Sequence, residues 1–389
     1  MGALLLLYAG GVLAQPQTPQ ERIPDRYIVV FEEGVRDPAA VANEHARENG
    51  LQVRFVYTNA IEGYAAVIPN DRVLQRVQND PRVAYIEQDQ VVRAVAQTLP
   101  WGIDRVDADK STTAAIDNLP PATASKVNAY IIDSGIYKTH ADLKVVKHVN
   151  FVGDGKNNDC NGHGTHVAGT VAAKDNAQDV VGVAPDVSLT GVKVLGCLGR
   201  GSWSGIIKGV DWVTANAAKP AIANMSLGGG ASQAVDDAVR KSANSGVFYS
   251  IAAGNDGANA CTYSPARAGR TKNADGTWNK NNGVMTVAAT NKTNGETSFS
   301  NYGACVDIWA PGYSILSTKK GGGTTTMSGT SMAAPHVGGG GALYLSLQTS
   351  ASSPTIEFEL KAAAAEAPEK PTTKSKDGAA IVLEYAGGF

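Results

Sequence analysis

The chain has 389 residues, with 34 lysines and arginines against 36 aspartates and glutamates and a formal net charge of −2. This balance excludes the strong basic excess of many nucleic-acid-binding proteins and the acidic run of a solvating tail. The 43 glycines and 17 prolines have no repeating period, which argues against collagen and low-complexity disorder, and the length favours two or three structural units.

The N-terminal stretch MGALLLLYAGGVLAQ combines a short apolar run with a finish of small residues around Val12, Leu13 and Ala14. This pattern is typical of a secretory signal and is too short to span a bilayer. The usual basic start is missing, as expected if the signal is truncated or its start misassigned, and a disordered apolar tail is the alternative. We expect residues 1–15 to be a signal peptide and the protein to be a secreted monomer without a membrane partner.

Residues 22–94 have the pattern of a small module. Apolar strands alternate with two helices, at residues 26–32, 38–49, 53–58, 63–68, 71–80 and 83–90. The resulting order β-α-β-β-α-β predicts a ferredoxin-like α+β fold. A linker of small residues follows between Val91 and Pro100, where we expect proteolytic processing.

Beyond Trp101, near-continuous apolar runs alternate with helical stretches. The strands are expected at 126–133, 188–195, 221–227 and 246–253, and the helices at 163–174, 202–216 and 232–245. This alternation predicts an α/β fold with a doubly wound, mostly parallel sheet. Functional residues in such sheets lie just beyond the carboxyl ends of the strands.

Asp133 ends the apolar strand AYIID, where its carboxylate can orient a histidine or belong to an ordinary turn. His163 and His166 follow in NGHGTHVAGT, at the start of a helix. Zinc hydrolysis is disfavoured, because the glutamate of HExxH is absent and the histidines are three residues apart. We assign His163 as the general base and His166 as structural, a choice that chemistry alone does not dictate.

Ser331 stands at the start of an apolar helical stretch, in SGTSMAAPHV. A serine in the first turn can present its hydroxyl beyond the strand ends and its N–H to an oxyanion, whereas the alternative is an N-cap. Pro335 is expected in the same first turn. Asn255, in IAAGND, either completes the oxyanion hole with its NH₂ group or belongs to a turn.

The stretches IIDSGI, NGHGTHVAGT, MSLGGG, AAGND and SGTSMAAPHV together resemble the signature blocks of the subtilase serine endopeptidases, in particular the aqualysin type of the proteinase K-like branch. The order Asp, His, Ser is that of subtilisin. The resemblance implies a catalytic domain over residues 98–389. Residues 22–94 would be its propeptide, acting as intramolecular inhibitor and folding aid. The implied triad is Asp133, His163 and Ser331, with Asn255 as oxyanion donor.

Two other functions are weaker alternatives. An α/β-hydrolase esterase requires GxSxG and the order Ser, Asp, His, whereas Ser331 lies in GTSMA and comes last. A binding protein built on an inactive protease scaffold would require distorted site geometry, since each expected catalytic residue is present.

The resemblance also implies a cleft for extended polypeptides. Residues 226–229 match the segment that pairs with a bound peptide as an added strand, 199–201 match the facing segment, and 252–254 would line an open P1 pocket. Backbone pairing recognises most extended peptides, so we expect broad specificity. The predicted cleft residues are Gly199, Arg200, Gly201, Ser226, Leu227, Gly228, Ala252, Ala253 and Gly254.

The four cysteines allow three pairings, and an export signal favours disulfides over free thiols. Sequence alone does not choose among the pairings. The family resemblance implies the bonds Cys160–Cys197 and Cys261–Cys305.

Asp307, in CVDIWAPG, resembles a calcium ligand of the proteinase K-like branch, whose other protein ligands are carbonyls after the YSPA segment. Here that segment continues over residues 267–283, longer than in relatives. The alternatives are a structural calcium ion and a solvated aspartate. No cofactor is expected for catalysis.

A second departure is the run Gly338–Gly341, where relatives have an alanine-rich helix. The run either loosens the helix behind Ser331 or permits close packing. Loosening predicts that Gly340→Ala raises the thermal midpoint.

Overall fold

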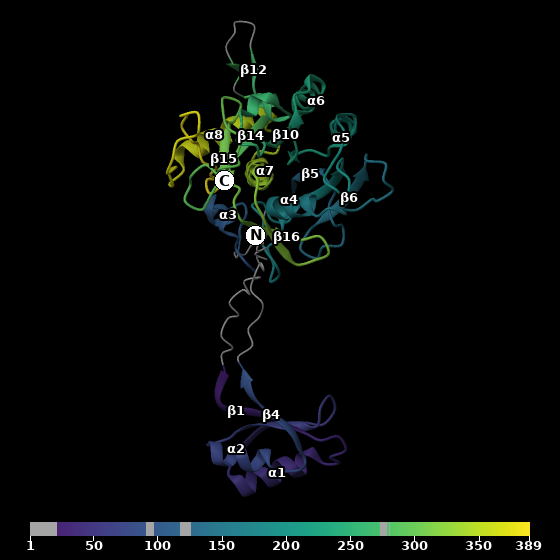
Figure 1. Cartoon of the computed structure of the whole chain (residues 1–389), viewed down its shortest axis with the longest axis vertical. Coiled ribbons are helices and arrows are strands. Elements are labelled where there is room, and N and C mark those ends of the chain that lie inside the picture. Colours follow the sequence, from purple (N-terminus) through teal and green to yellow (C-terminus); the bar gives the residue numbers. More distant parts are fainter. Residues whose placement is uncertain (1–21, 91–96, 117–125, 273–277, 280) are drawn as a thin grey trace, which may run out of the picture. The chain divides into compact units, whose positions relative to one another are not determined.

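The computed structural model describes residues 22–90, 97–116, 126–272, 278–279 and 281–389 (Figure 1). Its contacts divide the chain into two units, Met1–Ala94 and Val95–Phe389. The predicted signal peptide, residues 1–15, lies outside the described residues, as do residues 91–96 of the predicted linker. Within the described ranges, no helix has the length and apolar character needed to cross a membrane.

The N-terminal unit has the predicted ferredoxin-like fold. Its four strands form an antiparallel sheet in the order β2-β3-β1-β4, against which two helices pack. The elements are β1 (Arg22–Phe31), α1 (Pro38–Asn49), β2 (Gln52–Tyr57), β3 (Gly63–Val67), α2 (Asp71–Gln78) and β4 (Val83–Gln90). The sequence marks both ends of α1, since Asp37 caps its start and Gly50, at φ +67°, ends it.

The C-terminal unit contains a seven-stranded sheet in the order β15-β14-β10-β8-β5-β7-β6, and each neighbouring pair is parallel. Its strands are β5 (Asn128–Asp133), β6 (Val145–Asn150), β7 (Ser188–Lys193), β8 (Ala221–Met225), β10 (Val247–Ala252), β14 (Val284–Thr290) and β15 (Ile308–Pro311). Four of these strands match the predicted ones, whereas β6, β14 and β15 were not predicted.

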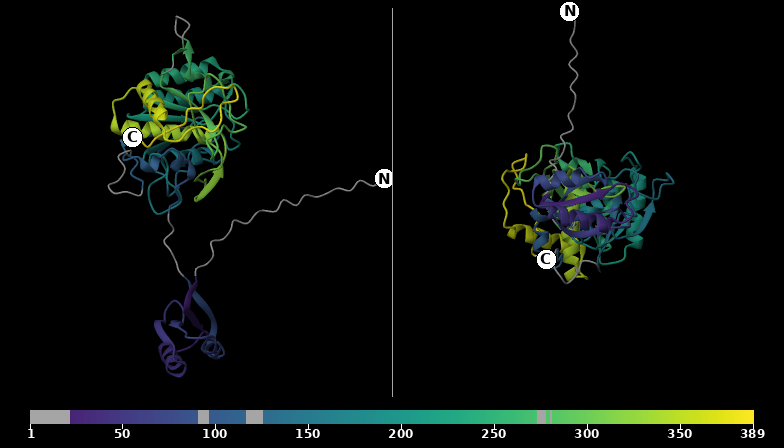
Figure 2. Two further views of the ribbon diagram at one scale, coloured as in Figure 1. Left: turned by 90° about the vertical axis from the view of Figure 1, so that its left-hand side faces the viewer. Right: turned by 90° about the horizontal axis from the view of Figure 1, so that it is seen from below.

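Helices cover both faces of this sheet, which confirms the doubly wound α/β fold (Figures 1 and 2). One face packs against α4 (His163–Ala172), α7 (Thr330–Leu347) and α8 (Ser353–Glu366), and the other against α5 (Trp203–Asn216) and α6 (Gln233–Asn244). Strand residues alternate between the two cores as a pleated sheet requires, so that Ile131 faces the first core and Ile132 the second.

Short elements complete the unit. They are α3 (Trp101–Arg105), the 3₁₀ turns η1 (Ala108–Lys110), η3 (Ala260–Thr262) and η4 (Ala266–Gly269), and the strand pairs β9 (Gly229–Gly230) with β11 (Tyr263–Ser264), β12 (Thr271–Lys272) with β13 (Trp278–Asn279), and β16 (Ile315–Thr318) with β17 (Thr324–Met327). The long segment 267–283 therefore contains the pair β12–β13, whereas its residues 273–277 and 280 lie outside the described part.

Two disulfides join Cys160 to Cys197 and Cys261 to Cys305, with Cα–Cα distances of 4.8 and 5.2 Å. This is the pairing that the family resemblance implies, and it uses all four cysteines of the chain.

The glycine run lies in the middle of α7, where it packs closely against its neighbours. A Cβ on Gly339 would lie 2.4 Å from Cβ of Val183, and one on Gly341 would lie 2.8 Å from the ring of Phe248. The structure therefore favours close packing over a loosened helix. A Cβ on Gly340 would lie 2.5 Å from the carboxylate of Glu384, which opposes the expected gain from Gly340→Ala.

Candidate active site

The predicted catalytic residues lie at the carboxyl edge of the sheet. Asp133 is the last residue of β5, and Asn255 follows β10. His163 is the first residue of α4 and Ser331 is the second residue of α7, and these two helices pack against each other. The fold thus carries these four residues, which are far apart in sequence, to strand ends and helix starts as predicted.

Asp133 and His163 form a charge-assisted hydrogen bond. Nδ1 of His163 donates to the carboxylate of Asp133, at 2.9 Å from Oδ1 and 3.0 Å from Oδ2. The Asp133 side chain is fully buried, whereas that of His163 is 26% exposed. The bond at Nδ1 leaves Nε2 as the nitrogen that can accept a proton.

The pKa of His163 reflects two opposing effects. Burial disfavours the imidazolium and lowers the pKa, but the negative charge of Asp133 and its hydrogen bond raise it more. The pKa of His163 therefore lies above its ordinary value of 6.5. A raised pKa suits a base that must hold a proton during the reaction.

Asp159 binds the backbone at the start of α4. This role was not predicted from the sequence. Its carboxylate is almost fully buried and accepts hydrogen bonds from the backbone N–H groups of Asn161, Gly162 and Thr165 at 2.8 to 3.0 Å. It also accepts from the hydroxyl of Ser134, directly after Asp133, at 3.0 Å. Asp159 therefore links the loop after β5 to the turn that presents His163. An aspartate shortly before a helix start was the available signal.

Ser331 lies inside the first turn of α7, and the N-cap of the helix is Gly329. The alternative interpretation of Ser331 as the N-cap is therefore wrong. N–H groups of a first helical turn have no intrahelical acceptor, so the N–H of Ser331 can bind an oxyanion. The hydroxyl of Ser331 donates to the carbonyl of Ser226 at 3.2 Å, and no hydrogen bond joins it to His163 within the described residues.

Pro335 leaves the carbonyl of Ser331 without its usual helical donor, and Ser226 binds this carbonyl. Pro335 is the sixth residue of α7, not part of the first turn as expected, and it lacks the N–H that would bond to the carbonyl of Ser331. The hydroxyl of Ser226 donates to that carbonyl instead, at 2.7 Å. The two serines therefore exchange hydrogen bonds, which ties the first turn of α7 to the residue directly after β8 (Ala221–Met225).

Asn255 is exposed, and its amide has a fixed orientation. Its Oδ1 accepts hydrogen bonds from the N–H and the hydroxyl of Thr330, at 2.8 and 2.9 Å. The NH₂ group lies beside Gly329, where an added Cβ would be 3.3 Å from Nδ2. A donor held next to the start of α7 is the arrangement that an oxyanion hole requires.

Two hollows meet beside these residues. One, of about 690 Å³, is lined by His163, residues 199–203 and residues 226–230, and the other, of about 260 Å³, by residues 252–256 and Ser331. They share the wall Leu227–Gly229 and together include all nine predicted cleft residues. Trp203, which the sequence analysis did not identify, packs against Gly229, where a Cβ would lie 2.8 Å from its ring.

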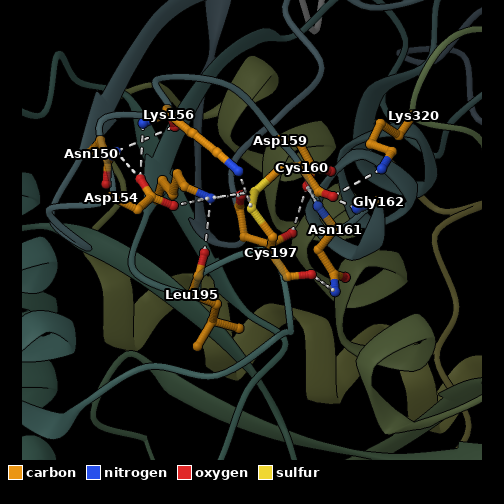
Figure 3. Close-up of a disulfide and its surroundings, with 12 residues drawn as sticks. Asn150, Asp154, Lys156, Asp159, Cys160, Asn161, Gly162, Leu195, Cys197 and Lys320 are labelled. Carbon is orange, nitrogen blue, oxygen red and sulfur yellow. Dashed lines mark hydrogen bonds and ion pairs between the residues drawn. A yellow bond between two sulfur atoms is a disulfide. The ribbon is translucent and has the colours of Figure 1, made fainter.

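A fully buried lysine, Lys193, lies beneath this edge, and it too was missed. Its ammonium donates to the carbonyls of Ser134 and Leu195, each at 3.1 Å, and lies 3.4 Å from Sγ of Cys160. The Cys160–Cys197 disulfide, which Figure 3 shows with Asn161 and Leu195 nearby, joins the turn before His163 to the segment that precedes residues 199–201. The lysine and the disulfide together fix the loops that border the cleft.

His166 has the structural position that was expected. Its ring is buried, and Nε2 donates to the carbonyls of Ile315 and Thr325 at 3.0 and 3.2 Å. Burial lowers the pKa of His166 to about 4, so the ring is neutral at neutral pH.

The residues at Asp307 do not fit a calcium site. The Asp307 side chain is 1% exposed, which contradicts a solvated aspartate. Its Oδ1 accepts from the ammonium of Lys361 at 2.8 Å and its Oδ2 from the N–H of Thr286 at 2.9 Å, so a lysine stands where a cation would bind. Asp154 approaches Cys160 and Cys197 elsewhere, but disulfide sulfurs are not thiolate ligands.

Comparisons with known proteins agree with this architecture. The family model "Subtilase family" matches residues 125–381, and "Peptidase inhibitor I9" matches residues 26–94. An extracellular serine proteinase of Thermus sp. (strain Rt41A) is 44% identical over 84% of this chain and 81% of its own length. Alkaline serine exoprotease A of Vibrio alginolyticus is 42% identical over 86% of this chain and 63% of its own length.

A solved structure is similar as well. The crystal structure of a cold-adapted subtilisin-like serine proteinase aligns with a TM-score of 0.62 and 39% identity, over 74% of this chain and 97% of that one.

Proposed function

The chain belongs to the subtilase family, and we propose that it is a secreted serine endopeptidase made as a zymogen, with Asp133, His163 and Ser331 as its triad. The observation that carries this proposal is the bond between buried Asp133 and partly exposed His163, at the sheet edge where α7 presents Ser331. Secretion is supported by the signal-like N-terminus and by the extracellular relative from Thermus.

The reaction is acyl transfer. Nε2 of His163 takes the proton of the Ser331 hydroxyl as Oγ attacks the peptide carbonyl, and Asp133 stabilises the imidazolium. In the structure the hydroxyl of Ser331 donates to the carbonyl of Ser226, so it must exchange this acceptor for Nε2 of His163 before the attack. The NH₂ group of Asn255 and the N–H of Ser331 bind the oxyanion, and water then hydrolyses the acyl-enzyme.

Extended polypeptides fit the cleft. The shared wall Leu227–Gly229 offers backbone groups for pairing with a substrate strand, and the hollow beside Ala252, Ala253 and Gly254 receives the P1 side chain. Several small residues line this second hollow together with Leu227 and Tyr263, and no charged side chain other than Asp256 borders it in the described part. Broad specificity follows, because backbone pairing supplies affinity without selecting side chains.

The N-terminal unit acts as an intramolecular inhibitor and is removed by self-cleavage between residues 92 and 98. Its match to an inhibitor family supports this role. Purified Ser331→Ala protein should remain full-length when incubated alone and should be processed when active enzyme is added. Maturation of isolated Ser331→Ala protein would contradict self-cleavage.

Covalent labelling tests the triad directly. A fluorophosphonate should label the mature protein on Ser331, as read by peptide mass mapping, and labelling should be lost in Ser331→Ala and strongly slowed in His163→Ala. A properly folded, propeptide-free protein that takes no label would favour the inactive scaffold instead.

A further inference from the structure

A buried cluster of charges lies at the amino edge of the sheet, opposite the proposed catalytic residues. Lys361 of α8 places its ammonium between two carboxylates, 2.8 Å from Oδ1 of Asp307 and 2.5 Å from Oε1 of Glu357. The Asp307 and Glu357 side chains are 1% and 0% exposed, and that of Lys361 is 24% exposed. The lysine therefore supplies one positive charge to two carboxylates that are almost closed to water.

The same cluster holds three chain segments together. Oε2 of Glu357 accepts the N–H groups of Asn282 and Gly283, each at 2.8 Å, where the long segment 267–283 returns to the sheet. Oδ2 of Asp307 accepts the N–H of Thr286, in β14 (Val284–Thr290), at 2.9 Å. Each carboxylate thus binds the lysine with one oxygen and the backbone with the other.

The nearby backbone carbonyls are also occupied by donors of the protein. The carbonyl of Ala266 accepts the hydroxyl of Thr286 at 2.6 Å. The carbonyl of Ala268 accepts the side chains of Asn282 at 2.9 Å and Arg240 at 3.1 Å. Calcium requires several oxygen ligands, and these two carbonyls already accept hydrogen bonds from the protein.

We propose that Lys361 is a built-in counterion that takes the place of a calcium ion at Asp307. The inference goes beyond the proposed function, because it concerns what stabilises the fold. A single ammonium, covalently attached to α8, joins Asp307 and Glu357 as a divalent cation would, but it needs no metal from the medium. The stability of this region is consequently independent of calcium.

The surroundings allow the proposal to be tested by substitution. A cavity of about 610 Å³, lined in part by Asp307, Phe358 and Lys361, opens beside the cluster. Removal of the ammonium would leave two facing carboxylates that a cation could reach through this cavity. The substitution Lys361→Met should therefore create a calcium site where the protein has none.

The first experiment uses the unaltered sequence. Mature protein, blocked on Ser331 to prevent self-digestion, is acylated with an amine-reactive ester, and each lysine is quantified by peptide mass mapping. Lys361 should react much more slowly than Lys208, whose side chain is 64% exposed, both in calcium and in a chelator. Calcium that accelerates acylation of Lys361 but not of Lys208 would show that the ion displaces the lysine, which would overturn the proposal.

The second experiment measures the thermal midpoint at a fixed scan rate. In a chelator, Lys361→Met should lose about 6 to 15 °C, the range expected when one partner of a buried ion pair is removed from a chain of this size. Excess calcium should restore part of the loss. Lys208→Met, which removes a lysine whose side chain is 64% exposed, should gain no additional stabilisation from calcium.

The ligands of the created site are checked with the double variant. Calcium should not rescue Asp307→Asn/Lys361→Met, because one carboxylate is gone. If calcium ions bound elsewhere raise the thermal midpoint of the unaltered protein, they should raise that of Asp307→Asn as well. Loss of that effect in Asp307→Asn, or a Lys361→Met protein that calcium fails to stabilise, would contradict the proposal. A variant that folds only with calcium would support it.

Discussion

Two aspartates at opposite edges of the same sheet have nearly the same surroundings. Asp133, at the carboxyl edge, and Asp307, at the amino edge, are 0% and 1% exposed. Their cationic partners, His163 and Lys361, are 26% and 24% exposed. Burial and ion pairing alone therefore do not distinguish the proposed catalytic aspartate, Asp133, from Asp307, which stabilises the fold.

The chemistry of the partner and the space around it make the difference. The imidazole of His163 can gain and lose a proton near neutral pH and borders an open hollow. The ammonium of Lys361 contacts a second carboxylate, and both carboxylates also bind backbone N–H groups. One pair can move a proton to a substrate, whereas the other holds chain segments together.

The largest expected effect is on kcat. Substitution of Asp133 should change kcat, whereas substitution of Asp307 should change the thermal midpoint. Asp133→Asn is expected to lower kcat by about 10⁴, because the amide no longer fixes the right tautomer of His163. Asp307→Asn should leave kcat per folded molecule unchanged and lower the thermal midpoint. Active-site titration with a fluorophosphonate, followed by peptide-substrate kinetics and thermal scans, measures both. A large loss of kcat in Asp307→Asn would contradict the assignment of Asp307 to fold stability alone.

The next effect concerns Asn255, the proposed oxyanion donor at the carboxyl edge of the sheet. Asn255→Ala should lower kcat by about 10² to 10³ with a small change in KM, as loss of such a donor does in subtilisin, a member of this family. Thr330→Val is the matched control, since it removes one hydrogen bond that orients Asn255 but keeps the amide. Its kcat should fall less. Equal losses would indicate that orientation, not donation, is the role of Asn255.

The pH dependence tests the partner of Asp133. In the proposed mechanism neutral His163 is the base, so activity should fall as the pH drops through its pKa, which lies above the ordinary 6.5. The midpoint of the acid limb of kcat/KM should therefore lie above 6.5. In Asp133→Asn the attraction is lost, and the midpoint of the residual activity should move to lower pH. A midpoint that stays in place would assign this limb to another group.

Glu384 shows what a buried carboxylate does without a bonded cation. Both of its oxygens lack a hydrogen-bond partner among the described residues, and burial raises its pKa to about 8, although Arg105 opposes the shift. Between the ordinary value of 4.5 and about 8, the unfolded chain releases this proton and the folded one keeps it. Stability should consequently fall as the pH rises through this range.

The substitution Glu384→Gln should flatten the fall of stability with pH. At pH values above 8 its thermal midpoint should be higher than that of the unaltered protein. Glu366→Gln, at an exposed position of α8, is the control and should leave the slope unchanged. An unaltered slope in Glu384→Gln would mean that other groups set it. Thermal scans of inhibitor-blocked protein across this pH range provide the measurement.

The two edges also differed in how far the sequence could predict them. Asp133 and His163 were found because a strand end and a helix start are local patterns, and the family blocks surround them. Lys361 and Glu357 were missed because their partners outside α8 are more than fifty residues away in the chain, and α8 itself was not predicted. Asp307 was identified, but its partner could be read only from the folded chain.

The missed strands have local reasons. β15 is only four residues long, too short for a periodic signal, and β6 has no fully buried residue and so lacks a continuous apolar run. β14, VMTVAAT, is buried throughout and mostly apolar, and it could have been predicted from the rule that identified its neighbours.

The smallest effects concern the glycines of α7, the helix that begins beside Ser331 and packs against Glu384 at Gly340. Gly339→Ala should destabilise by about 1 to 3 kcal/mol, because the new Cβ would press on Cβ of Val183, which is attached directly to the backbone. Gly340→Ala should change stability by less, since its closest contact is the end of a longer side chain, and the gain in helix propensity of about 0.5 to 1 kcal/mol offsets part of the cost. Chemical denaturation of the inhibitor-blocked protein measures both. Equal losses would show that the carboxylate of Glu384 is held as rigidly as the wall at Val183.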